Sequence, residues 1–218
     1  MVNKRFYKLI LIILALLSTS MIGCSSKNKN TVRNIELTER EKVIARFSGD
    51  MLAVLNFEYG NDIGGQALYL EEWIKGEKTN SYTISYGGTS ETYGLYINSN
   101  VIKNDYSACE GVEWNLMTET QGLRTLLNPR YFQFPDNKTL DFSSQSVLGE
   151  NQKNKVKLEP GKEYVLAARF FYLSVNDIKD IQCESIAEQE DLLKNIDYAV
   201  LLRLALYNTE EEAERLNR

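Results

Sequence analysis

The stretch Tyr164-Val165-Leu166-Ala167-Ala168-Arg169-Phe170-Phe171-Tyr172-Leu173 decides which fold this chain can adopt. Side chains of a β-strand point alternately to two faces, and here both alternating sets are apolar apart from Arg169. A run that is apolar on both faces is typical of a strand covered on both sides. We therefore predict a central strand of a sheet over residues 164–173.

A second apolar run, Tyr198–Tyr207, follows Asn195-Ile196-Asp197, a segment that is typical of a break between elements. The alternating side chains of this run fit a buried strand, although its leucine and alanine content also fits a helix. A strand here would complete a sheet, and we predict a strand.

Shorter segments elsewhere have the alternation or the composition of strands. Gly87-Gly88 lies between two of them and has turn chemistry, so we predict a hairpin there, with Tyr82, Ile84 and Tyr86 on one face. These strand segments are 51–57, 68–74, 81–86, 92–98, 112–117 and 140–148.

Three capping boxes predict short helices. In such a box a Ser or Thr and a Glu three residues later each bond an otherwise unpaired backbone N–H at the start of a helix. The boxes begin at Thr38, Ser185 and Thr209. Strands and helices together predict a mainly β fold: a single β-sandwich-like domain, residues 37–218, with a few short peripheral helices.

The first residues have the parts of a secretory signal. Lys4, Arg5 and Lys8 form a positive region, and residues 9–17 are an unbroken apolar run. As a helix this run would span about 14 Å, whereas the hydrocarbon layer of a membrane is about 30 Å thick. A cleaved signal is therefore favoured over a permanent membrane helix.

Met21-Ile22-Gly23-Cys24 closes this leader and resembles the lipobox of bacterial lipoproteins. The resemblance implies cleavage between Gly23 and Cys24 and a diacylglyceryl group on the Cys24 thiol; the alternative is an ordinary secretory signal. It also implies a location on the extracytoplasmic face of the cell membrane. Residues 1–23 would be the signal peptide and the polar residues 24–36 a lipid-anchored flexible linker.

Leu158-x-Pro160-Gly161-x-x-Tyr164 resembles the turn into the penultimate strand of fibronectin type III and related immunoglobulin-like sandwiches. In those domains a tyrosine hydroxyl reaches back to the backbone of the preceding loop. The resemblance implies the same role for Tyr164 and a loose sandwich class.

Two cysteines remain beyond the leader, Cys109 and Cys183. Outside the cytoplasm they could pair, and closing a loop of this length would stabilise the fold by about 4 kcal/mol. Spacing along the sequence does not fix pairing, so separate buried thiols are the alternative.

The charge balance and the missing histidine exclude several classes of function. Without the leader, 22 Lys and Arg stand against 30 Asp and Glu, which argues against a nucleic-acid partner. With no histidine and no glycine-rich phosphate loop, histidine-based catalytic sets are excluded and neither a metal nor a cofactor is predicted. Two carboxylate pairs could serve a glycosidase: Glu71 and Glu72 beside Trp73, and Glu110 and Glu113 beside Trp114.

Aromatic side chains are the better functional lead. Exposed rings stack on sugars or anchor a protein partner, whereas in strands they also pack across the sheet into the core, which is the alternative. The candidates for a binding surface are Trp73, Tyr82, Tyr86, Tyr96 and Trp114.

These features predict a non-enzymatic binding domain, held by a lipid on Cys24 outside the cytoplasmic membrane, with a protein or an envelope component as its partner. A receptor for a small molecule or a glycan is the first alternative. A carboxylate-based glycan hydrolase is the second.

Overall fold

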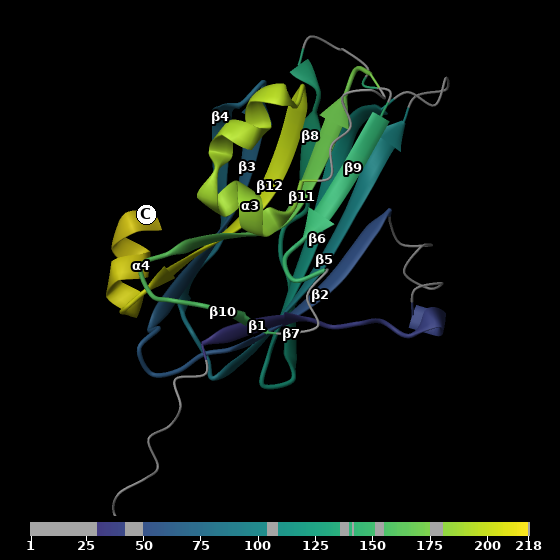
Figure 1. Cartoon of the computed structure of the whole chain (residues 1–218). Helices are drawn as coiled ribbons and strands as arrows, with labels where there is room; N and C mark the ends of the chain where they lie inside the picture. Colours follow the sequence, from purple (N-terminus) through teal and green to yellow (C-terminus); the bar gives the residue numbers. More distant parts are fainter. Residues whose placement is uncertain are drawn as a thin grey trace, which may run out of the picture.

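The structure, a computed structural model, describes residues 30–41, 50–103, 109–135, 140, 142–150, 155–174 and 181–217. Two antiparallel sheets pack face to face, as Figure 1 shows. The prediction of a mainly β, sandwich-like domain with a few short helices is confirmed.

Sheet A has seven strands in the order β10-β1-β2-β5-β6-β7, and β8 also pairs with β6. Its strands are β10 (Val156–Lys157), β1 (Thr31–Asn34), β2 (Met51–Glu58), β5 (Thr92–Lys103), β6 (Cys109–Thr120), β7 (Leu123–Leu126) and β8 (Arg130–Gln133). Sheet B has the order β4-β3-β12-β11-β9. Its strands are β4 (Glu77–Gly88), β3 (Gly65–Ile74), β12 (Tyr198–Tyr207), β11 (Glu163–Tyr172) and β9 (Phe142–Val147).

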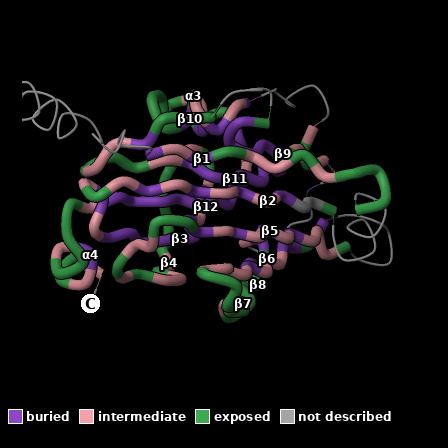
Figure 2. The backbone as a smooth tube through the Cα atoms, turned by 90° about the horizontal axis from the view of Figure 1, so that it is seen from below, coloured by how far each residue is buried: buried purple, intermediate pink, exposed green. Residues whose placement is uncertain are grey.

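The two apolar runs form neighbouring strands inside sheet B. Strand β12 lies between β3 and β11, and β11 lies between β12 and β9. Every residue from Val165 to Tyr172 and from Tyr198 to Leu206 is buried, and Figure 2 shows this continuous burial along β12. Both predicted strands are confirmed, since β12 is extended rather than helical.

Sheet B is covered on both faces, which explains why these runs have no polar side. One face packs on sheet A, where the ring of Phe134 lies 4.7 Å from Phe171 and 4.8 Å from Tyr198 between centroids. The other face is covered by α3 (Cys183–Glu188), η3 (Glu190–Asn195) and α4 (Glu210–Asn217) (Figure 1). The core therefore has two layers, one on each side of sheet B.

The predicted hairpin around Gly87-Gly88 is wrong. Strands β4 and β5 exist, but β4 pairs with β3 in sheet B, whereas β5 pairs with β2 and β6 in sheet A. Between β4 and β5 the chain therefore crosses from sheet B to sheet A. Thr89 stabilises this crossing, because its N–H donates to the Gly64 carbonyl at 3.2 Å and its hydroxyl to the Ile63 carbonyl at 2.6 Å. Turn chemistry marks a change of direction but does not specify which strand becomes the partner.

A β-bulge also overturns the prediction that Tyr82 and Tyr86 share a face. The register between β3 and β4 shifts at Ile84, so that Tyr82 lies opposite Leu70 and Tyr86 lies opposite Ala67. One extra residue reverses the alternation of side chains beyond it. The two tyrosines therefore project from opposite faces of sheet B.

The predicted flexible linker ends earlier than residue 36, because Thr31–Asn34 forms strand β1 between β2 and β10. Val32 is buried, and the preceding Asn30 donates from Nδ2 to the Asp62 carboxylate at 2.9 Å. A polar composition concealed this strand, since a short strand near a sheet edge needs only one buried side chain. Residues 24–29 lie outside the described part of the chain.

Two of the three predicted capping boxes are present. The Thr38 hydroxyl accepts the Glu41 N–H at 3.3 Å, while the Glu41 carboxylate accepts the Thr38 N–H at 2.8 Å; the helix predicted behind this box extends into residues outside those described. Thr209 caps α4 by accepting the Glu212 N–H at 3.1 Å. The box at Ser185 is wrong, because α3 already begins at Cys183 and has no side-chain cap.

Tyr164 makes the contact that its sequence setting predicts. Its hydroxyl accepts a hydrogen bond from the backbone N–H of Glu159 at 2.8 Å. The bond joins the start of β11 to the turn around Gly161, a glycine with φ of +75° that few other residues adopt without strain. Tyr164 therefore fixes the entry of the chain into the central pair of strands.

Replacing Tyr164 by Phe should lower the free energy of unfolding by about 1 kcal/mol, because a half-buried backbone N–H loses its acceptor. Urea unfolding followed by circular dichroism measures this loss. Tyr86→Phe is the matched control, since Tyr86 is 45% exposed and its variant should be within about 0.5 kcal/mol of the natural chain. Equal effects of the two substitutions would contradict the role assigned to the Tyr164 hydroxyl.

Candidate functional site

Two of the five residues predicted to form a binding surface are buried. Trp73 is 5% exposed and Trp114 is 1% exposed. The indole Nε1 of Trp73 donates to Oε2 of Glu71 at 3.1 Å, on the face of sheet B away from sheet A. The prediction that these two rings lie on a binding surface is wrong, because large rings in interior strands are more stable inside the core.

The three tyrosines lie on three different surfaces. Tyr82 faces the space between the sheets, with its ring centroid 5.6 Å from that of Phe132. Tyr86 is exposed on the opposite face of β4, and Tyr96 is half-buried on the outward face of sheet A. The structure therefore does not bring the predicted aromatic residues together into one site.

The two cysteines are separate buried thiols and no disulfide joins them. Burial raises the pKa of the Cys183 thiol to about 12. A thiol of this kind stays protonated near neutral pH and is a poor nucleophile. The sequence left open a disulfide or two separate buried thiols, and the structure has the separate thiols.

The carboxylates of the first predicted pair, Glu71 and Glu72, project from opposite faces of sheet B. Glu71 projects toward the helix-covered side of sheet B, whereas Glu72 projects toward the other side and accepts the Tyr198 hydroxyl at 2.6 Å. Glu113 is half-buried on the outward face of sheet A, while the neighbouring Trp114 points into the core. Glu71 and Glu72 therefore lack the arrangement of two carboxyl groups flanking one bond that glycoside hydrolysis requires.

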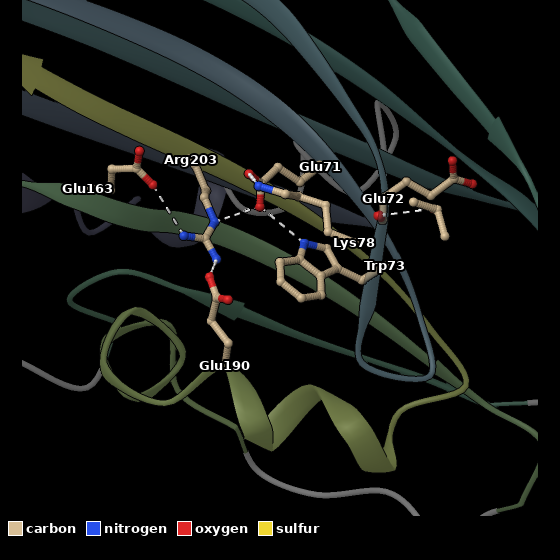
Figure 3. Close-up of polar contacts among 8 residues, drawn as sticks. Glu71, Glu72, Trp73, Lys78, Glu163, Glu190 and Arg203 are labelled. Carbon is tan, nitrogen blue, oxygen red and sulfur yellow. Dashed lines mark hydrogen bonds and ion pairs between the residues drawn. The ribbon is translucent and has the colours of Figure 1, made fainter.

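A buried ion cluster is centred on Arg203 of β12, as Figure 3 shows. Its Nε lies 2.7 Å from Oε2 of Glu71, whose side chain is 6% exposed. Nη1 lies 3.4 Å from Oε2 of Glu163, and Nη2 donates to Oε1 of Glu190. We call these four residues the Arg203 cluster; they come from β12, β3, β11 and η3.

Two further side chains complete the surroundings of Glu71. Lys78 Nζ lies 3.1 Å from its Oε1, and Trp73 donates to its Oε2. The Arg203 guanidinium also lies over the Trp73 ring, 5.8 Å from the centroid. A charge taken out of water is costly unless it is paired and hydrogen-bonded, and here Glu71 has three partners.

The Arg203 cluster serves the fold rather than a ligand. Each nitrogen of the guanidinium faces a carboxylate, so the group has no open side with which to bind an anion. Because Glu190 belongs to η3, the cluster ties the helical layer to sheet B. Arg203 is the one charged residue in the apolar run 198–207, and this position in the sequence is the signal from which a buried ion pair could have been predicted.

The outward face of sheet A differs from that of sheet B, because α3 and α4 pack on sheet B (Figures 1 and 2) and η3 joins it through Glu190. Strand register aligns four apolar or aromatic side chains directly across this face, each opposite the next. We call them the outward row: Val54, Tyr96, Met117 and Leu126. Three are half-buried, while Leu126 at the sheet edge is 69% exposed.

Tyr96 is held in place within this row. Its hydroxyl donates to Oε2 of Glu119 at 2.8 Å, which raises the pKa of Tyr96 and lowers the pKa of Glu119. Arg124 binds the same carboxylate oxygen at 2.9 Å and lies over the ring at 5.9 Å from the centroid. The ring is therefore oriented without help from a ligand, a property that lowers the entropy cost of binding.

A hollow of about 670 Å³ opens where the outward face of sheet A meets the loops between β2 and β3 and between β4 and β5. One wall is formed by side chains of β2 and β5, namely Asn56, Glu58 and Thr92. The loop residues Asn61, Ser90 and Glu91 form the other. The sequence did not reveal this hollow, because its two loops come together only through the crossing between the sheets.

Within the described ranges, no group of three or more Cys, Asp or Glu side chains is arranged to hold a metal ion. In the same ranges, no helix is long and apolar enough to cross a membrane. Comparison with protein-family models, curated proteins and solved structures finds no match. A function is therefore argued from the geometry and the leader alone.

Replacing Glu71 by Leu should lower the free energy of unfolding by about 3 kcal/mol, because Arg203 loses its only buried counter-ion. The double variant Glu71→Leu with Arg203→Met should recover most of this loss, since it buries no charge. Urea unfolding measures both.

Glu163→Gln is the matched control, because the Glu163 side chain is 60% exposed and its ion pair should contribute less than about 1 kcal/mol. If Glu71→Leu and Glu163→Gln have the same effect, the cluster does not depend on its buried pair.

Proposed function

We propose that this protein is a lipid-anchored lipoprotein outside the cytoplasmic membrane, whose β-sandwich binds a protein or an envelope component without catalysing a reaction. The observation that carries the proposal of binding is the outward row of sheet A. It places apolar and aromatic side chains in register on a sheet face over which the described residues form no helical layer of the kind that covers sheet B. Exposed apolar patches of this kind are typical of interaction sites.

The anchor rests on the leader and its lipobox-like end at Cys24. Asn30, only six positions further along the chain, is already part of the fold, because its side chain bonds Asp62 and accepts the Gly60 N–H at 2.6 Å. Six extended residues span at most about 20 Å. A lipid on Cys24 would therefore hold the β2–β3 end of the sandwich close to the membrane.

This arrangement supports a binding role for the outward row. Strands β2, β5 and β6 of sheet A lead away from the end at which Asn30 lies, so the face that carries Tyr96 and Met117 would stand beside the membrane rather than against it. A partner in the envelope could then reach the row from the side. Arg124, Glu119 and Asn98 around the row would provide a polar rim.

A photoreactive amino acid at Leu126 should cross-link one defined partner in intact cells, because Leu126 is the most exposed member of the outward row. The same amino acid at Glu77, the distant first residue of β4, is the matched control and should not cross-link that species. Gel mobility and peptide mass spectrometry identify the product.

In a Cys24→Ala background the product from Leu126 should disappear, because the domain is no longer held at the membrane. Equal cross-linking from Leu126 and Glu77 would contradict a binding role for the outward row.

A further inference from the structure

We propose that the hollow between the β2–β3 and β4–β5 loops binds an uncharged or cationic polyhydroxylated group, that is, a sugar. This goes beyond the proposed function, since it assigns a second site and a ligand class and requires neither the anchor nor the outward row. The volume of about 670 Å³ lies within the range of about 300–1,000 Å³ usual for ligand pockets. It is large enough for one or two sugar rings.

The walls of the hollow are held before any ligand arrives. The Tyr59 N–H donates to the Glu91 carbonyl at 3.0 Å and so joins the two loops directly. Thr89 bonds the Ile63 and Gly64 carbonyls, and Asn30 bonds Gly60 and Asp62. Sites that are ordered in advance lose less entropy when a ligand binds, which matters for ligands as polar as sugars.

The lining side chains have the chemistry that recognises hydroxyl groups. Asn56 and Asn61 each offer an amide donor and acceptor, and Ser90 and Thr92 offer hydroxyls. Glu91 is exposed and has no ion-pair partner within the described part of the chain, so its carboxylate is available as an acceptor. Charge-assisted hydrogen bonds to a carboxylate are about twice as strong as neutral ones.

The charge of the hollow selects among ligands. Its lining contains the carboxylates of Glu58 and Glu91 and no basic side chain. Lys155 pairs with Glu58 at 2.7 Å, which neutralises one of the two carboxylates. A phosphate or a carboxylate ligand would be repelled by Glu91, whereas a neutral or amino sugar would not.

The position of the hollow leaves two sources for such a sugar. The side chain of Asn30 donates to Asp62 in the loop that forms one wall, so Asn30, six positions after Cys24 in the sequence, lies beside the hollow. The ligand is then either a free glycan or the headgroup of a glycolipid in the same membrane. Both present the same hydroxyl chemistry, and the experiment below separates them.

The test is ligand-observed saturation-transfer NMR on protein expressed from the full 218-residue sequence and purified in a sugar-free detergent. The probes are chitotriose, maltotriose, and digalactosyl diacylglycerol in mixed micelles. At least one probe should receive saturation. Asn61→Trp, which fills the hollow from one loop, and Glu91→Arg, which reverses a charge on the other, should each weaken that binding about tenfold or more.

Glu77→Arg is the matched control, because Glu77 is exposed as the first residue of β4, at the opposite end of sheet B, and this variant should bind like the natural chain. Transfer to a trisaccharide that both hollow variants weaken supports the site with a free glycan. Transfer to the micelles alone, weakened in the same way, supports it with a glycolipid. No transfer to any probe, or transfer that both folded variants retain, overturns the proposal.

Discussion

The pairing of β11 with β12 is the constraint on which the rest of this structure depends. Both strands are buried along their length, so neither offers a face that water can cover. Sheet A must therefore pack on one side and a helical layer on the other, since an apolar strand face left in water costs about 25 cal/mol per Å². The crossing of the chain at Thr89 and the placement of α3, η3 and α4 all serve this double covering.

One arginine on each of these strands joins the layers. Arg169 of β11 points toward sheet A, where it donates from Nη2 to the Ser99 carbonyl at 3.0 Å. Burial lowers its pKa from the usual value. Arg203 of β12 points the other way and binds carboxylates from β3, β11 and η3. The two charges that interrupt otherwise apolar runs thus provide polar connections from sheet B to each of its two coverings.

The sequence predicted the parts of the fold that depend on local pattern. The run at 164–173, the alternation at 198–207 and the caps at Thr38 and Thr209 required no knowledge of partners. Strand pairing could not be predicted in this way, because Gly87-Gly88 allows a hairpin and a crossing equally well. The bulge at Ile84 could not be predicted from the sequence either, and it is the reason that Tyr82 and Tyr86 project from opposite faces of sheet B.

The candidate sites depend on this long-range register. Trp73 and Trp114 were predicted to lie on a binding surface because they are aromatic, yet both side chains are buried. Val54, Met117 and Leu126 carried no signal, and the outward row exists only because four strands align. The single charge in the run 198–207 was the exception, since a guanidinium taken out of water is costly unless it is paired or hydrogen-bonded.

In the proposed arrangement, the leader would tether a domain whose fold determines which end lies at the membrane and which face is exposed. Asn30 would place such a tether at the end with the hollow, and sheet A would then carry the outward row along the side. The whole arrangement depends on the chemistry of Cys24. Mass spectrometry of the N-terminal peptide of the membrane-extracted protein tests it most directly. The account predicts a chain that begins at Cys24 with a diacylglyceryl group on its sulfur, and an unmodified Cys24 or a retained Met1 would contradict it.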